Sequence, residues 1–219
     1  MDAAAFVAEL SSVNESILNR LAPAQALVAE ARGDLSPRNL LRIALKNELE
    51  ASEIAALWMP SAASAELKLA LARQAGDEAR HYRLIADRLR AMGDRLEGFD
   101  PLAQGYSPMF RFLGSLQSDV ERVAAGQFTR EAIALVKNAQ FIELCERAGD
   151  LATAMLYRGV IQPDEHYHHQ LGRHFLQRLA TDERSQELAR AAQSRTIALA
   201  EELQSLALQR SGIHHAPGC

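Results

Sequence analysis

Signals that begin and end helices divide this chain into a few long segments, and they restrict how those segments can pack. Ser36-Pro37 and Ser107-Pro108 each place an N-cap residue before a proline at the first helical position. Pro60 and Gly149-Asp150 interrupt the pattern with almost no intervening loop. The sequence therefore predicts helices over 37–59, from Ser61 or Ser64 to 92, over 108–148 with an interruption near Gly114 left open, and over 150–180.

Residues 93–107 form the one long predicted connection, because they hold three glycines and an Asp-Pro and show no periodicity. Short turns make consecutive helices antiparallel, and a long crossover lets a second hairpin dock on the first. We therefore expect an all-α four-helix bundle with one long crossover. The predicted organisation is an N-terminal helical extension at 1–36 with a break at Pro23, the bundle at 37–180, a C-terminal helix at 181–210 that packs on the bundle, and a flexible tail at 211–219.

The composition agrees with helices. Alanine and leucine dominate the chain, whereas valine, isoleucine and threonine are scarce and aromatic residues make up only 5%. Strands favour β-branched and aromatic side chains, so an all-β or α/β fold is disfavoured. The net charge of −4 lacks the basic excess that binding to nucleic-acid phosphates needs.

The absence of targeting signals and the small number of cysteines predict the compartment in which the protein is found. No stretch approaches the roughly 18 uninterrupted apolar residues of a membrane span, and the N-terminus, with Asp2 and Glu9, lacks a basic-then-apolar leader. Two cysteines, Cys145 and Cys219, cannot make a disulfide framework. The sequence predicts a soluble cytoplasmic protein that binds neither membrane nor nucleic acid.

Two segments repeat one pattern, Asp-Glu-x-x-His, at residues 77–81 and 164–168. Residues three apart share a helix face, so the glutamate and histidine of each segment can bind one ion together. A lone Glu-x-x-His is expected roughly 0.6 times per chain by chance, but two copies that both follow an aspartate have a chance of about one in a thousand. The repeat is therefore a strong indication of a metal site.

The other two helices each offer one carboxylate on an apolar face. Glu48 lies among Leu41, Ala44, Leu45 and Ala51, with Glu50 or Glu53 as alternatives; Glu131 lies among Ala124, Phe128 and Ala134. A carboxylate on such a face must be protonated, paired or metal-bound.

The spacing from the turns supports this choice. Glu48 and Glu78 lie nearly equally far along the chain from the turn near residue 62, on either side of it. Glu131 and Glu165 are placed in the same way about Gly149, at a similar separation. Because each helical residue rises by about 1.5 Å, these four glutamates fall at similar heights. We therefore expect them to meet at one level of the bundle.

The set Glu48, Glu78-x-x-His81, Glu131 and Glu165-x-x-His168 resembles the ligand set of the ferritin-like di-iron carboxylate superfamily. Residues 77–81 are similar to the Asp-Glu-x-Arg-His motif of bacterial di-iron monooxygenases, and residues 47–52 resemble the first ligand helix of ferritins. The resemblance covers roughly residues 37–180. It implies a centre of two iron ions, or manganese, or a mixed iron–manganese pair.

The resemblance also implies roles. Glu78 and Glu165 would bridge the ions, Glu48 and Glu131 would be terminal ligands, and His81 and His168 would give each ion one nitrogen. Around these ligands we expect partners that orient the imidazoles, Asp77 and Asp164, with Arg80 beside them. His166 and Tyr167 depart from the first motif, and Pro163 predicts a kink or bulge near the site. Tyr82 and Phe128 each lie one turn from a predicted ligand, and we expect them, with Gln127, to line a substrate or oxygen pocket; simple core packing of Tyr82 and Phe128 is the alternative.

The expected function is a dinuclear-metal oxidoreductase that activates dioxygen or peroxide and oxidises a small organic substrate, with electrons from a donor protein. One alternative is an iron-handling or peroxide-scavenging protein of the ferritin or rubrerythrin kind, although no Cys-x-x-Cys pair exists for a rubredoxin-type centre. A second alternative is a non-catalytic helical scaffold whose carboxylates pair with arginines. The last helix leaves a homodimer open.

Overall fold

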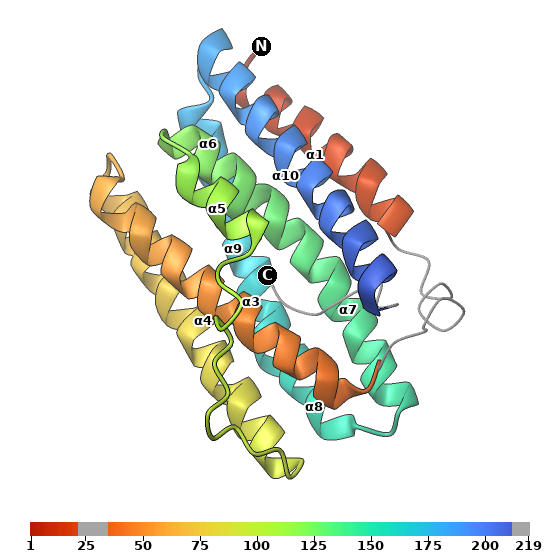
Figure 1. The fold of residues 1–219 in the computed structure, drawn as a ribbon. Helices are drawn as coiled ribbons and strands as arrows, with labels where there is room; N and C mark the ends of the chain where they lie inside the picture. Colours follow the sequence, from red (N-terminus) through yellow and green to blue (C-terminus); the bar gives the residue numbers. More distant parts are fainter. Residues whose placement is uncertain (22–34, 212–219) are drawn as a thin grey trace.

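The computed structural model describes residues 1–21 and 35–211, and within these ranges all regular structure is helical (Figure 1). This confirms the all-α prediction. The α-helices are α1 (Ala3–Leu21), α3 (Pro37–Trp58), α4 (Ala65–Ala91), α5 (Pro108–Ser115), α6 (Asp119–Val123), α7 (Glu131–Arg147), α8 (Leu151–Leu156), α9 (Gln162–Leu179) and α10 (Glu183–Ser211). A 3₁₀ turn, Met59–Ser61, follows α3, and the π-helical turns η2 (Ala124–Arg130) and η3 (Tyr157–Ile161) join α6 to α7 and α8 to α9.

Side-chain caps place the helix starts where the sequence predicted them. Ser36, Ser64, Ser107 and Asp150 each accept a hydrogen bond from a backbone N–H in the first turn of α3, α4, α5 and α8. The segment predicted as one helix over 108–148 is interrupted at residues 116–118, because Ser118 forms a capping box that starts α6 as a new helix. The break near Gly114 that the sequence left open is therefore present.

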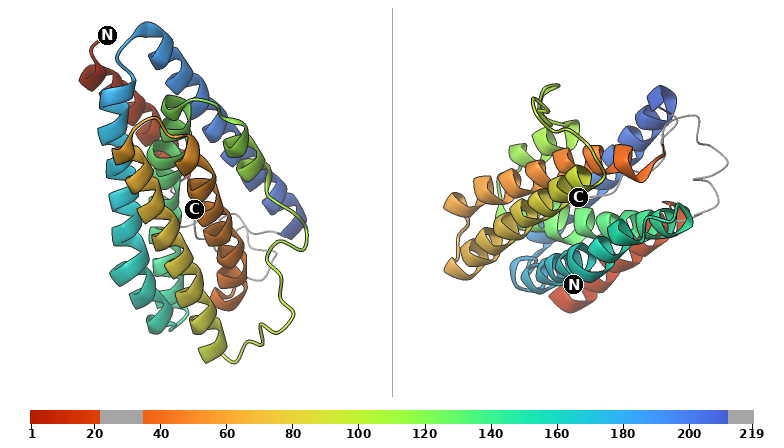
Figure 2. Two further views of the ribbon diagram at one scale, coloured as in Figure 1. Left: turned by 90° about the vertical axis from the view of Figure 1, so that its left-hand side faces the viewer. Right: turned by 90° about the horizontal axis from the view of Figure 1, so that it is seen from below.

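Four long helical rods run side by side: α3, α4, the α6–η2–α7 rod and the α8–η3–α9 rod (Figure 2). The connection after α4 returns along α3 to α5. Lys46 of α3 donates to the Gly105 carbonyl at 2.5 Å, and Glu50 accepts from the backbone N–H of Ser107 at 2.7 Å. These contacts hold the long crossover against the first hairpin.

Two apolar clusters occupy opposite ends of the four rods. One gathers around Trp58 and Phe128 and includes Leu71 and Leu176; the other includes Leu41, Ile85, Phe141 and Tyr157. On each rod, a short stretch that belongs to neither cluster separates the two, and the predicted ligands lie in those stretches. A polar layer between two apolar layers is thus built into all four rods.

The helices α1 and α10 form an outer layer against one side of the rods (Figure 1). Phe6 of α1 is fully buried, and Arg190 of α10 makes a two-point ion pair with Glu9 of α1 at 2.8 and 3.1 Å. The predicted break at Pro23 and the tail from residue 212 lie outside the described residues. Within the described part of the chain, no helix combines the length and apolarity that crossing a membrane requires.

The two π-helical turns lie directly before segments that carry predicted ligands. Pro163 lacks a backbone donor and its ring crowds the carbonyl four residues earlier. The wider turn η3, which ends two residues before Pro163, is the bulge that the sequence predicted. The turn η2, which ends just before Glu131, was not expected from the sequence.

Candidate metal centre

The structure brings the six predicted ligands together at the middle of the four rods. The side chains of all six are fully buried. They form two groups of four residues, and within each group one ligand atom per residue lies within 4.8 Å of the ligand atoms of the other three. The groups share Glu78 and Glu165, so two ions held there would be neighbours. The first group is Glu48, Glu78, His81 and Glu165, and the second is Glu78, Glu131, Glu165 and His168.

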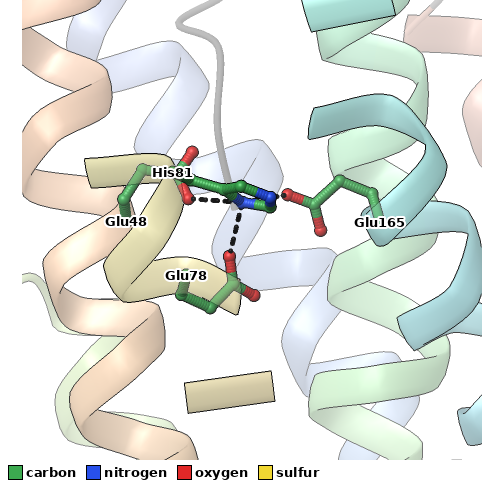
Figure 3. Close-up of side chains that lie close together, drawn as sticks. All are labelled: Glu48, Glu78, His81 and Glu165. Carbon is green, nitrogen blue, oxygen red and sulfur yellow. Dashed lines mark hydrogen bonds and ion pairs between the residues drawn. The ribbon is translucent and has the colours of Figure 1, made fainter. Parts of the chain in front are cut away.

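In the first group, Nδ1 of His81 is the central atom (Figure 3). It lies 3.1 Å from Oε2 of Glu78, 3.3 Å from Oε2 of Glu48 and 3.8 Å from Oε1 of Glu165. Three helices, α3, α4 and α9, therefore supply ligand atoms that face one point.

In the second group, Nδ1 of His168 lies 3.4 Å from Oε1 of Glu78 and 3.6 Å from Oε2 of Glu165, and it makes no hydrogen bond within the described residues. Glu131, the first residue of α7, completes this group. Each imidazole thus presents Nδ1 to the carboxylates, which leaves Nε2 to face outward.

The outward nitrogens meet the two predicted aspartates, and they do so across the helix interface. Nε2 of His81 lies 2.9 Å from Oδ2 of Asp164, and Nε2 of His168 lies 3.2 Å from Oδ2 of Asp77. Each motif therefore supplies the aspartate for the histidine of the other motif. A proton on Nε2, held by the carboxylate, leaves the Nδ1 lone pair available to a cation.

Arginines hold these aspartates from outside. Arg80 donates to Asp164, and Arg73 Nε lies 3.4 Å from Oδ2 of Asp77. The Arg73 guanidinium also lies 3.5 Å above the ring of Tyr167. The second motif has Tyr167 at the position where the first motif has Arg80. Arg73 of α4 supplies the arginine for Asp77 instead. Sequence reasoning missed Arg73, although its position four residues before Asp77 is the spacing of a helical ion pair.

Amide side chains hold the carboxylates of the second group. Gln74, which is buried, donates from Nε2 to Oε1 of Glu131 at 2.7 Å, and lies 3.4 Å from Oε1 of Glu78. Gln127, expected to line a pocket, donates to Oε1 of Gln74 at 2.8 Å. The sequence analysis did not single out Gln74; its position one turn before Glu78, on the same helix face, was the available signal.

The other two predicted pocket residues lie at opposite ends of the polar layer. Phe128 is fully buried in the cluster around Trp58, and its carbonyl accepts from Nδ1 of His169 at 2.9 Å. Tyr82 is half-buried against the other apolar cluster.

Glu50 and Glu53, the alternatives to Glu48, are outside both ligand groups. Glu50 binds the backbone N–H and hydroxyl of Ser107. Hydrogen bonding to Glu53 raises the pKa of Tyr106, which places that carboxylate beside the crossover.

The electrostatics of the site reflect four buried carboxylates and two imidazoles. Burial raises the pKa of Glu48 to about 7, helped by the nearby charge of Glu78. Burial, Glu78 and Glu131 raise the pKa of Glu165 well above its usual range. Burial acts the same way on Glu78, but its close contacts with the imidazoles of His168 and His81 outweigh burial and hold the Glu78 pKa well below its ordinary value.

The imidazoles bind protons strongly. Burial lowers the pKa of His81, but its contacts with Glu48 and Glu78 outweigh this and raise the pKa to about 12. The pKa of His168 is also raised, because Asp77, Glu165 and Glu78 outweigh the effect of burial. Without metal, protons therefore occupy the positions where cations would be held.

The two ligand groups could each hold a metal ion. Their oxygen and imidazole donors suit metals other than those that prefer sulfur ligands. Neither oxygen of Glu48, nor Nδ1 of His168, has a hydrogen-bond partner in the described part of the chain. Buried polar atoms normally have partners, and a cation in each ligand group would provide them. Comparisons with protein family models, curated proteins and solved structures return no match.

Proposed function

We propose that this protein is a ferritin-like four-helix bundle with a dinuclear iron or iron–manganese centre, and that it is an oxidoreductase that activates dioxygen or peroxide. The observation that carries the proposal is the pair of fully buried ligand groups that share Glu78 and Glu165. A scaffold has no physical need to bury four carboxylates at one level, because burial of charge without compensation is costly.

The chain's residues would divide the work as the resemblance implies. Glu78 and Glu165 would lie between the ions, Glu48 and His81 would complete one coordination sphere, and Glu131 and His168 would complete the other. When bound, a redox-active metal pair supplies the two electrons that the reduction of dioxygen or peroxide requires.

The surroundings of the ligands support chemistry of this kind. Asp164 and Asp77 fix the orientation of the imidazoles, and their own positions are set by Arg80 and Arg73. Apolar clusters flank the layer on both sides, and the six predicted ligand side chains are fully buried. A small organic substrate would therefore meet a dry site, where competing reactions with water are suppressed. A separate donor protein would supply electrons for repeated turnover.

Metal content tests the proposal. Protein produced with added iron and manganese is analysed for metal per chain, together with Glu165→Ala and the control Glu187→Ala, an exposed glutamate of α10. We expect about two ions per chain in wild type and control, and at most one in Glu165→Ala, which removes a ligand from both groups. Wild-type protein that stays metal-free and equally stable would refute the dinuclear centre.

Reactivity separates an oxidoreductase from an iron-handling protein. The loaded protein is chemically reduced and exposed to dioxygen or peroxide in the absence and presence of small organic compounds. Oxidation of an added compound supports the oxygenase or oxidase function. Rapid oxidation of excess Fe²⁺ into a ferric core, without oxidation of organic compounds, would instead support iron handling.

A further inference from the structure

The two ligand groups contain the same kinds of ligand, but their terminal carboxylates have different surroundings. Glu131 accepts the hydrogen bond of Gln74 at 2.7 Å. Within the described residues, neither oxygen of Glu48 accepts a hydrogen bond. His81, whose Nδ1 lies 3.3 Å from Glu48, makes its hydrogen bond to Glu78 instead. The centre is thus symmetric in its ligands and asymmetric in the donors around them.

Two runs of amide hydrogen bonds meet at the turn η2, one from the outer layer and one that leads through Gln74 to Glu131. Gln193 of α10 donates to Oδ1 of Asn14 of α1 at 2.9 Å, and Asn14 donates to the Phe128 carbonyl of η2 at 3.4 Å. Gln127, the residue before Phe128, donates to Gln74 at 2.8 Å. The bonds from Gln127 to Gln74 and from Gln74 to Glu131 are continuous, and hydrogen bonds joined in this way polarise one another, which strengthens Gln74 as a donor.

The π-helical turn η2 links these two runs. It carries both the Phe128 carbonyl and the Gln127 side chain, and it ends just before Glu131. The outer helices therefore help to fix the position of the turn. The turn in turn fixes the positions of Glu131 and of the Gln127 amide, which is hydrogen-bonded to Gln74. No comparable series of donors reaches Glu48 among the described residues.

We propose that Gln74 is a positioning residue that makes the two ion sites unequal, so that the site of Glu48 fills before the site of Glu131. This rests on the proposed dinuclear centre. A bound cation gives Glu48 the partner that its oxygens lack in the described ranges, whereas Glu131 already accepts the Gln74 bond and so gains less from a cation. A hydrogen bond to a charged group changes an equilibrium by about tenfold or more, so the first ion binds correspondingly more tightly.

The order of filling has a chemical consequence. A protein whose sites fill together holds two copies of whichever ion is most available. A protein whose sites fill in order holds a single ion when metal is limiting, and the second position then accepts an ion of a different element. Gln74 thereby makes a mixed pair accessible to this chain.

A titration of metal-free, full-length protein with Mn²⁺ tests the order, with calorimetry for affinity and electron paramagnetic resonance for the state of the ions. We expect two phases whose dissociation constants differ by about tenfold or more. The signal of isolated Mn²⁺ grows in the first phase, and the signal of a coupled pair replaces it in the second. Glu48→Ala is expected to abolish the tight phase and Glu131→Ala the weak one.

Gln74→Met removes the amide and keeps an unbranched side chain. It is expected to narrow the ratio of the two dissociation constants to within about threefold, since both carboxylates then lack the donor. Gln127→Met leaves every carboxylate contact in place and is expected to narrow the ratio of the two dissociation constants by a smaller factor than Gln74→Met does. It takes the place of Gln74→Met as the test if that variant does not fold. The control, Gln177→Met at an exposed position of α9, leaves the ratio unchanged.

The outcomes separate this inference from the proposed function. Two Mn²⁺ ions that bind wild type in a single phase, or an unchanged ratio in both Gln74→Met and Gln127→Met, overturn the role of Gln74 and leave the dinuclear centre standing. A tight phase that survives Glu48→Ala also overturns the order. Wild-type protein that binds no Mn²⁺, Fe²⁺ or Co²⁺ overturns the dinuclear centre itself.

Discussion

The contact between Gly172 of α9 and the π-helical turn η2 gives the sharpest test of how the site is built. Gly172 lies one helical turn after His168, and a Cβ added there would lie 2.6 Å from the Phe128 nitrogen and 2.7 Å from the Gln127 carbonyl carbon. Ordinary contacts of a Cβ begin at 3.4 Å. Because the opposing atoms are backbone, no side-chain rotation relieves the overlap, and α9 and η2 would have to separate by about 0.8 Å.

Gly172→Ala is therefore expected to destabilise the protein. Overpacking of this kind costs about 1–3 kcal/mol, and the better helix propensity of alanine offsets up to about 1 kcal/mol. Because the overlap is with backbone atoms, we expect a cost in the upper part of that range, about 2–3 kcal/mol. The net loss is then about 1–2 kcal/mol, which lowers the melting temperature by about 2–8 °C for a chain of this size. The separation would also shift Glu131 relative to His168, so the metal content should fall.

The matched control is Gly76→Ala in α4, where an added Cβ meets nothing within 4 Å. Here only the helix propensity changes, so the melting temperature should rise by about 2–4 °C. Thermal unfolding of the metal-free proteins, followed by circular dichroism, gives both values. If Gly172→Ala melts at or above the wild-type temperature while Gly76→Ala behaves as expected, the close approach of α9 to η2 is wrong.

Four further predictions address the ligands, the protons and the fold. Asp164→Ala removes the partner of His81 Nε2 and should weaken the affinity for Mn²⁺ about 10- to 100-fold, whereas the exposed Asp87→Ala should not; equal affinities would contradict the orienting role. Folding raises the pKa of Glu48 from 4.5 to about 7 and the pKa of His81 from 6.5 to about 12. Between these values the folded metal-free protein binds more protons than the unfolded chain. Its unfolding free energy should therefore fall as the pH rises from 4.5 toward 12. Because ions displace these protons, the melting-temperature increase on adding Mn²⁺ should be larger at about pH 8 than at about pH 6, and a smaller increase would refute the proton–metal exchange. Ser118→Ala should cost about 1 kcal/mol in urea unfolding through loss of the capping box, and no change would mean that the start of α6 does not depend on it.

Local signals were sufficient for much of the fold. Ser36, Ser107 and Asp150 cap helices because their side chains reach a backbone N–H only three residues away, a contact that depends on no distant part of the chain. The interruption before Ser118 was harder to locate, because leucine and glycine at 113–116 fit helix and turn alike.

The ligand faces could also be found from the sequence. Glu78 and His81 share a face because each residue of a helix adds a fixed rise and rotation, and equal distances from a turn give equal heights in antiparallel neighbours. The same reasoning placed Glu48 and Glu131 at that level. Helix rise and spacing from a turn do not determine how far one helix is rotated about its own axis relative to its neighbour.

The contacts between helices depended on that rotation. His81 binds Asp164 of the opposite motif, Gln74 reaches Glu131 on another rod, and Gly172 admits the backbone of η2. The sequence by itself determined where most of the long helical segments begin, which faces are apolar and which six side chains could meet. Only the tertiary structure decided which donor serves which carboxylate, because hydrogen bonds between helices require distances near about 3 Å, and only the packing of all the helices together sets positions that finely.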